Sequence, residues 1–254
     1  MPLADNELLE CLRSADHIAV LTGPGVSAES GIPTFRDALS GLWSKYDPAD
    51  LATPEAFARD PELVARWYDE RRCMVARCRP NSGHFALAEL QRIILSQGKR
   101  FTLITQNVDR LHQAAGSKDV IELHGTLWLW RCMDCGDDVE ERGPAFTEFP
   151  PRCSCGGRRR PGVVWFGEKL PGHALLQAQK ATGSCQLFMS LGTSSVVYPA
   201  AGLVDLAIQN GAKLLEVNLQ ETVSSSRAHW SIRGKTGEVL PRLVAEAFGK
   251  DKNP

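Results

Sequence analysis

The sequence lacks a long hydrophobic run and lacks an excess of charge of either sign. No segment approaches the about 18 apolar residues of a membrane span, and residues 1–17 carry acids without an apolar core. Lys plus Arg number 29 against 30 for Asp plus Glu, so no overall field attracts nucleic acid or a membrane surface. Internal repeats and low-complexity segments are missing as well. With 254 residues, 43% of them hydrophobic, the chain is expected to be a globular, cytoplasmic protein and a monomer, with no specific nucleic-acid or membrane partner.

An export signal is also missing, which changes the interpretation of the eight cysteines. In a reducing compartment cysteines are metal ligands or free thiols rather than disulfides. Cys132-x-x-Cys135 and Cys153-x-Cys155 can supply four thiolates to one tetrahedral zinc ion, which leaves no open position for water. We therefore predict a structural zinc site at Cys132, Cys135, Cys153 and Cys155. The alternative is free thiols or a redox pair.

Apolar runs and helix-like segments alternate along most of the chain. This spacing is typical of a parallel sheet covered by helices on both faces. The expected strands are 17–21, 101–105, 120–123, a strand near 163, 185–191 and 213–217. The expected helices are a first helix capped by Asp5, then 61–78, 82–97, 109–115, 174–180, 199–210 and 240–248.

The turn after the first strand is rich in glycine. Thr22-Gly23-Pro24-Gly25 is followed by a small polar segment, which indicates a strand, a tight turn and the start of a helix. Such a turn can hold a phosphate, because glycines let the backbone approach an anion and the first helical NH groups are unpaired. The third glycine of a dinucleotide fingerprint is absent, since Ala28 stands in its place. The pattern alone leaves an ordinary strand-to-helix turn open.

Six spaced motifs give the sequence its most specific signal. They are GPGVSAESGIPTFR at 23–36, QNVD at 106–109, ELHG at 122–125, VVWFGE at 163–168, GTS at 192–194 and VNL at 217–219. Together with the cysteines, and in this order, they resemble the sirtuins, the NAD-dependent protein-lysine deacylases. Two residues depart from the usual pattern. Pro24 replaces an alanine and removes one NH donor, and Thr34 replaces the aspartate common in the deacetylase branch.

The resemblance implies a fold of two parts. A Rossmann-like, NAD-binding domain would comprise residues 1–41, 80–125 and 162–254. The helical insertion 42–79 and the zinc-ribbon insertion 126–161 would fold together as a smaller domain. NAD and an acyl-lysine protein or peptide would bind between the two domains.

The resemblance also implies a reaction and its residues. The acyl-lysine oxygen attacks C1′ of the nicotinamide ribose, nicotinamide leaves, and His124 activates a ribose hydroxyl that takes over the acyl carbon. The products are free lysine, nicotinamide and O-acyl-ADP-ribose. Asn107 orients ribose or a water. The implied NAD-binding residues are Gly23, Pro24, Gly25, Glu29, Thr34, Phe35, Arg36, Gln106, Asn107, Asp109, Gly192, Thr193, Ser194, Asn218, Leu219 and Thr236. Val164, Phe166 and Gly167 form the edge to which an extended peptide would add as a strand.

Tyr68 and Arg71 bear on the acyl group. Three residues apart on one helix, they share a face. Tyr-x-x-Arg at this position resembles the sirtuin branch that removes succinyl, malonyl and glutaryl groups. A guanidinium grips a carboxylate with two hydrogen bonds and a phenol adds a third, whereas an acetyl group offers neither partner. The alternative is an amphipathic helix with a half-buried tyrosine and a solvated arginine.

Other activities remain open on the sequence. The enzyme could be mainly a deacetylase of the same family, or a mono-ADP-ribosyltransferase, which breaks the same glycosidic bond. A nicotinamide dehydrogenase would share the first strand and turn but would not need QNVD and His124 together. A zinc-ribbon nucleic-acid binder would use the cysteines with the arginines at 158–160, although such a run is more often a solvated face or balances a zinc-thiolate centre.

Overall fold

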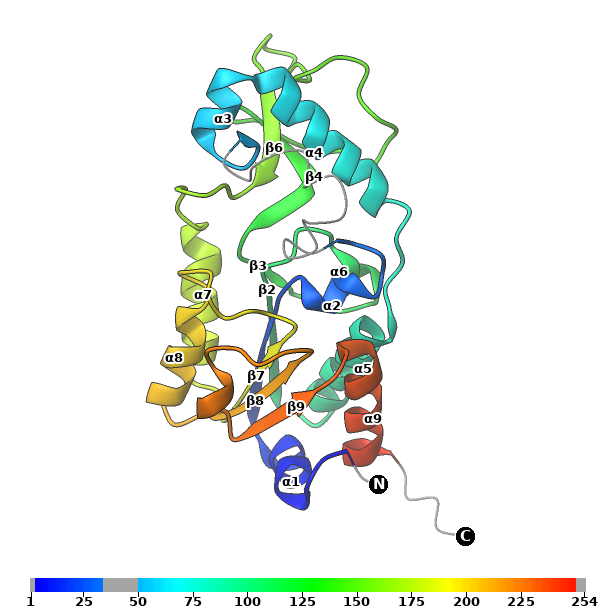
Figure 1. Cartoon of the computed structure of the whole chain (residues 1–254), viewed down its shortest axis with the longest axis vertical. Helices are drawn as coiled ribbons and strands as arrows, with labels where there is room; N and C mark the ends of the chain where they lie inside the picture. Colours follow the sequence, from blue (N-terminus) through cyan, green and yellow to red (C-terminus); the bar gives the residue numbers. More distant parts are fainter. Residues whose placement is uncertain (1–2, 34–49, 250–254) are drawn as a thin grey trace.

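The computed structural model describes residues 3–33 and 50–249, which form two layers along the long axis of the molecule (Figure 1). One end holds a six-stranded sheet and its helices. The other end holds a three-stranded sheet and the helices α3 (Pro54–Arg59) and α4 (Pro61–Val75). The predicted fold class, an α/β fold with a parallel sheet, is confirmed.

The large sheet is parallel throughout. Its strands are β1 (His17–Thr22), β2 (Arg100–Thr105), β3 (Ile121–Glu122), β7 (Leu187–Leu191), β8 (Lys213–Asn218) and β9 (Trp230–Arg233). Their spatial order is β3-β2-β1-β7-β8-β9. Every residue of β1 and β7 is buried, as expected for central strands with helices on both faces. The strand order reverses between β1 and β7, and open α/β sheets bind ligands at such a point.

Two groups of helices cover the sheet. One face packs against α1 (Asn6–Ser14), α5 (Ser82–Ser96) and α9 (Thr236–Phe248), whose leucines join one large apolar core. The other face packs against α7 (Gly172–Thr182) and α8 (Gly202–Gln209). The predicted cap of α1 is present, since Asp5 Oδ1 accepts a hydrogen bond from the Leu8 NH at 2.8 Å. Among the described helices, none is long and apolar enough to cross a membrane.

The end of the molecule with the three-stranded sheet, called the small layer below, has an apolar core that contains four tryptophans. Its antiparallel sheet has the order β5-β4-β6, with β4 (Gly125–Cys132), β5 (Asp138–Glu140) and β6 (Arg159–Val163). Trp67 of α4, Trp128 and Trp130 of β4, and Trp165 after β6 share one apolar core. Residues far apart in the sequence are therefore packed into a single unit.

A buried ion pair ties α4 to the segment after β5. Arg72 is fully buried and donates to Asp69 Oδ1 at 2.6 Å. It also donates to the Gly143 and Pro144 carbonyls at 2.8 and 2.7 Å. Because every charged atom has a partner, the pair fixes one arrangement of these segments.

Three sequence expectations need correction. The strand near Val163 does not continue the parallel sheet, because β6 pairs antiparallel with β4. The sequence expectation omitted β9, whose four residues have alternating half-buried and exposed side chains at a sheet edge. The last helix begins at Thr236, not near residue 240. The first turn of this helix contacts a distant part of the chain, because Glu29 Oε1 accepts a hydrogen bond from the Gly237 NH at 3.1 Å.

Candidate functional site

Two loops meet at the reversal point of the sheet. The first follows β1 and leads into the short helix α2 (Gly25–Ala28); the second follows β7. The Gly23 NH donates to the Leu191 carbonyl at 3.0 Å, and the Gly25 NH donates to the Gly192 carbonyl at 2.8 Å. A Cβ on Gly25 would lie 2.8 Å from that carbonyl oxygen, so the loops can approach only because the position is glycine.

A cavity of about 220 Å³ lies beside these loops. Six predicted NAD-binding residues line it: Gly25, Glu29, Gly192, Asn218, Leu219 and Thr236. Thr236 Oγ1 is buried and has no hydrogen-bond partner within the described residues, as expected where a polar ligand completes a site. The lining also includes Ala28, together with Gly234 and Lys235, which the sequence analysis did not name. In the sequence, Gly234 and Lys235 could have been found as a Gly-Lys pair directly before a helix.

The residues after β2 reach toward the same loops. Gln106 Nε2 donates to Thr193 Oγ1 at 2.9 Å, and Asn218 Nδ2 donates to the Thr193 carbonyl at 2.9 Å. Predicted residues from the ends of β2, β7 and β8 are thereby joined. Pro24 occupies the position before α2 without a capping hydrogen bond from its side chain, and Ser194 is half-buried beside Thr193. Thr34, Phe35 and Arg36 lie outside the described residues.

Asn107 and Asp109 are held by Ser27. Asn107 Nδ2 donates to Ser27 Oγ at 3.0 Å, and Ser27 Oγ donates to Asp109 Oδ2 at 2.7 Å. Asp109 Oδ1 accepts the Leu111 NH at 2.8 Å. Burial raises the pKa of Asp109. The hydrogen bonds that Asp109 accepts from the Leu111 NH and from Ser27 act in the opposite direction and lower it. Asn107 Oδ1 is buried and has no partner within the described part of the chain, so this oxygen can accept a hydrogen bond from a ligand.

Two buried histidines support this network, and the sequence analysis missed both. His84 Nδ1 accepts the Asn81 NH, so Nε2 carries the proton that faces Ser27 Oγ at 3.4 Å. His112 Nε2 lies 2.9 Å from Thr22 Oγ1. Burial lowers the pKa of His84 to about 4 and that of His112 to about 3. Both imidazoles are therefore neutral at neutral pH.

His124 lies between the two layers, just after β3. Its Nδ1 is 3.1 Å from the Gln106 carbonyl. A carbonyl only accepts, so Nδ1 carries the proton and Nε2 keeps the lone pair that a general base needs. Burial lowers the pKa of His124 below its usual value, which keeps the ring neutral. The His124 carbonyl accepts the Val164 NH at 2.9 Å, so the predicted base and the predicted peptide edge are directly connected.

The peptide edge and the acyl residues adjoin each other through Trp165. Phe166 is 52% exposed and its NH donates to the Ala52 carbonyl at 2.9 Å, while Gly167 has a φ of +85°. Tyr68 is 6.2 Å from Trp165 between ring centroids. The structure therefore brings the two predicted substrate groups to one part of the small layer.

Tyr68 is buried and Arg71 is half-buried. Burial raises the pKa of Tyr68 to about 12, and the nearby Arg71 opposes the shift. Burial also lowers the pKa of Arg71, and Tyr68 opposes that shift in turn. The Arg71 guanidinium stacks 4.7 Å above the Trp67 ring. Arg71 is therefore half-buried and packed on Trp67.

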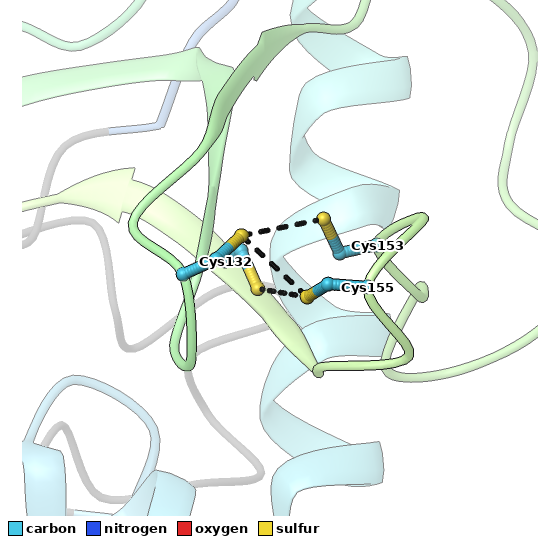
Figure 2. A group of neighbouring side chains, drawn as sticks. Cys132, Cys153 and Cys155 are labelled. Atoms are coloured by element: carbon cyan, nitrogen blue, oxygen red, sulfur yellow. Dashed lines mark hydrogen bonds between the residues drawn. The ribbon is translucent and has the colours of Figure 1, made fainter.

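The four predicted zinc ligands come together (Figure 2). Cys153 and Cys155 face Cys132, which ends β4. The sulfur of Cys155 is 3.5 Å from those of Cys132 and Cys135, and the Cys135 and Cys153 sulfurs are 3.7 Å apart. Ligands of a tetrahedral zinc at the usual bond length lie about 3.8 Å apart. The four cysteines are thus close enough to bind a zinc ion, and their geometry fits that metal.

Of the arginines at 158–160, Arg158 is exposed, and the other two contact groups within the protein. Arg159 is 8% exposed and donates to Cys153 Sγ at 3.2 Å and to Asp137 Oδ2 at 2.6 Å. Arg160 pairs with Glu168 at 2.6 Å and stacks 3.5 Å above the Trp165 ring. One arginine therefore balances thiolate charge, and the next supports the predicted substrate edge.

This combination defines a class of protein. A parallel sheet with glycine loops and a cavity at its reversal point is typical of α/β proteins that bind nucleotides, and His124 follows β3 of the same sheet. A sequence model of the Sir2 family matches residues 23–199. The chain belongs to the Sir2 family.

Related proteins align with almost the whole length of this chain. NAD-dependent protein deacylase 1 of Pseudomonas aeruginosa is 49% identical over 249 residues, which is 95% of this chain and 98% of the relative. A solved Sir2 homologue in complex with NAD is 44% identical, with a TM-score of 0.90, and the alignment covers 97% of this chain and 94% of that one. A Sir2 solved with a p53 peptide and NAD is 34% identical, with a TM-score of 0.81 and coverages of 95% and 97%.

Proposed function

We propose that this enzyme removes acidic acyl groups, succinyl and malonyl, from protein lysines. The broader activity, NAD-dependent protein deacylation with NAD as co-substrate, follows from its family and its relatives. The acyl preference rests on one observation, the half-buried Arg71 on the same helix as the buried Tyr68, each side chain opposing the pKa shift of the other. Removing a cation from water is costly, and a bound carboxylate offsets that cost with charge-assisted hydrogen bonds. An acetyl group provides no such compensation.

The catalytic roles follow from the network around His124. His124 Nε2 acts as the general base toward the ribose hydroxyl, because Gln106 fixes the proton on Nδ1. Asn107 presents its unpaired Oδ1 to ribose or a water. Asp109, held by Ser27, takes the nicotinamide carboxamide, and Gln106 lines the same end. These groups are already oriented by hydrogen bonds, so little reorganisation opposes the reaction.

The remaining predicted residues bind the rest of NAD and the peptide. Gly23, Gly25, Thr193 and Ser194 receive the phosphates, and Asn218 receives the adenosine ribose beside the cavity. An extended acyl-lysine peptide adds along Val164, Phe166 and Gly167. The p53-peptide complex of a Sir2 relative supports a peptide substrate. The domain division at residues 42–79 and 126–161 is part of the same proposal.

Substitution of Arg71 tests the acyl preference. Arg71→Met removes the guanidinium and its charge and keeps an unbranched apolar stem. We expect KM for a succinyl-lysine peptide to rise about thirtyfold or more, the loss of a charge-assisted pair, and KM for the acetyl-lysine peptide to change less than about threefold. Arg66→Met is the matched control, because Arg66 lies on the same helix in an exposed pair with Glu62. Equal changes in KM for both peptides would return Arg71 to a structural role and leave a deacetylase.

A further inference from the structure

An ion pair between Arg110 and Glu122, called the tie below, connects two parts of the site. Arg110 follows Asp109 directly and precedes the short helix α6 (Leu111–Ala114). Its Nε and Nη2 atoms donate to Glu122 Oε1 and Oε2 at 3.0 and 3.4 Å. Glu122 is the last residue of β3 and lies two positions before His124. The guanidinium therefore joins the loop at 106–109 to the segment that carries the proposed base.

The backbone of Arg110 adopts a conformation that costs free energy. Its φ is +59°, in the left-handed region that residues with a Cβ seldom occupy. The side chains of Arg110 and Glu122 are largely withdrawn from solvent, at 22% and 20% exposed, so solvent screens the pair less than it screens surface pairs.

β3 has only two residues and lies at the edge of the large sheet, with β2 as its neighbour there, so the position of its end rests on contacts made by Glu122 and the residues after it. Besides Arg110, Gln113 Nε2 donates to Glu122 Oε1 at 2.9 Å, and the Leu123 NH donates to the Thr105 carbonyl at 2.9 Å. The loop at 106–109 has supports that do not involve Arg110, including Asp109 to Ser27 and Gln106 to Thr193. Loss of the Arg110–Glu122 contact is therefore expected to disturb the segment leading to His124 more than the loop at 106–109.

A second contact extends the tie to the cysteine-bearing sheet. Arg110 Nη1 donates to Glu140 Oε1 at 2.9 Å, and Glu140 is the last residue of β5. That strand pairs with β4, which ends at Cys132. Glu140 is 45% exposed, so this arm contributes less than the contact with Glu122.

We propose that Arg110 is a positioning residue, which aligns His124 through Glu122 and fastens that alignment to the cysteine-bearing sheet. The proposal rests on the proposed role of His124 as the base that acts after nicotinamide has left. Arg110 itself is not assigned any contact with NAD or peptide. Its loss is expected to slow the step that needs His124 while the earlier cleavage of nicotinamide continues.

Two rates measured on each variant test the proposal. Exchange of labelled nicotinamide into NAD, in the presence of acyl peptide, reports the first step, and formation of O-acyl-ADP-ribose reports the step that needs the base. Arg110→Lys keeps the charge but loses the fork. We expect product formation to fall about tenfold or more, and nicotinamide exchange to fall less than about threefold. Glu122→Gln, which removes the charge from the other side, is expected to show the same imbalance.

Arg131→Lys is the matched control. Arg131 forms a similar fork with Asp138, at 2.8 Å for each prong, within the small sheet and away from His124. We expect its two rates to stay in their wild-type ratio. The double variant Arg110→Lys/Glu122→Gln should be about as slow as the slower single variant, because both changes remove one contact.

Three results would overturn the proposal: equal falls in both rates for Arg110→Lys and Glu122→Gln, the same imbalance in Arg131→Lys, or additive losses in the double variant. His124→Ala in the same assay separates this proposal from the one on which it rests. An active His124→Ala enzyme would overturn both. An inactive one, beside an unchanged rate ratio in Arg110→Lys, would overturn only the role of Arg110.

Discussion

His124 shows how single residues acquire their chemistry from their neighbours. A histidine alone in a sequence is more often structural, but here one ring nitrogen faces the Gln106 carbonyl and burial lowers the pKa of the ring. His84 and His112 are fully buried, and burial keeps these rings neutral in supporting positions, whereas His124 is half-buried. Exposure and hydrogen-bond partners together distinguish the proposed base from the two supporting histidines.

Replacement of His124 is the first residue-scale prediction. His124→Ala should lower product formation by at least about a hundredfold, because general-base catalysis contributes about that much or more. The wild-type rate should fall in acid only as the pH passes below the usual imidazole value of 6.5, since burial lowers the pKa of His124. Circular dichroism and metal content should be unchanged in the variant. Retention of more than a few per cent of activity, roughly, would contradict the base assignment.

The buried pair of supporting histidines predicts how stability depends on pH. The unfolded imidazole titrates near 6.5, whereas the folded pKa of His84 is about 4. Below pH 6.5 the unfolded state therefore binds more protons, and the free energy of unfolding falls as the pH falls toward 4. The loss from His84 alone is about 3 kcal/mol.

Urea unfolding of His84→Gln and the wild type between these pH values measures this dependence. The variant lacks the titrating group, so its unfolding free energy should fall less over the same range. His229→Gln is the control, because His229 lies after the large sheet's β8 and away from the buried pair. Identical slopes in His84→Gln and the wild type would rule out a neutral, buried His84.

At the scale of elements, the cysteine segment illustrates long-range assembly. The Cys132 NH donates to the Asp137 carbonyl at 2.8 Å, and the Cys153 NH donates to the Gly157 carbonyl at 2.8 Å. These turns bring two cysteine pairs to tetrahedral spacing, with Arg159 against one of them. Since β5 is short and exposed, a bound zinc ion is expected to be a main support of this end of the small sheet.

Loss of a ligand tests that expectation. Cys132→Ser should reduce the zinc content from one ion per chain toward zero and lower Tm by roughly 10 °C, because metal binding contributes directly to folding. Cys11→Ser is the control, since this half-buried thiol lies outside the cluster. Atomic absorption and differential scanning calorimetry measure the two effects. A Cys132→Ser protein with full zinc and an unchanged Tm would contradict the site.

At the scale of the whole molecule, the sequence was most informative where chemistry and local signals coincide. The glycine turn, the strand ends that carry Asn107 and His124, and the Asp5 cap all follow from short segments. The sequence analysis missed features that depend on distant partners. The start of α9 has Glu29 as a partner 208 positions away, and β9 forms beside β8. The support of Asn107 by Ser27 likewise joins residues 80 positions apart.

The whole molecule also determines the proposed acyl preference. Tyr68 and Arg71 come from α4, the peptide edge from the segment after β6, and His124 from the end of the large sheet. In the proposed function, only the packing of the two layers brings these groups to one substrate. Selectivity is therefore expected to be a property of the assembled enzyme and not of either layer alone.

Mass spectrometry of one peptide, carrying either succinyl-lysine or acetyl-lysine, tests the central claim most directly. With NAD present, the account predicts that the succinyl group is removed at least about tenfold more efficiently and that nicotinamide and O-succinyl-ADP-ribose appear in equal amounts. Faster removal of acetyl would contradict the acidic-acyl preference and identify a deacetylase. ADP-ribose transferred to the peptide, with the acyl group retained, would contradict the proposed deacylation and identify a transferase.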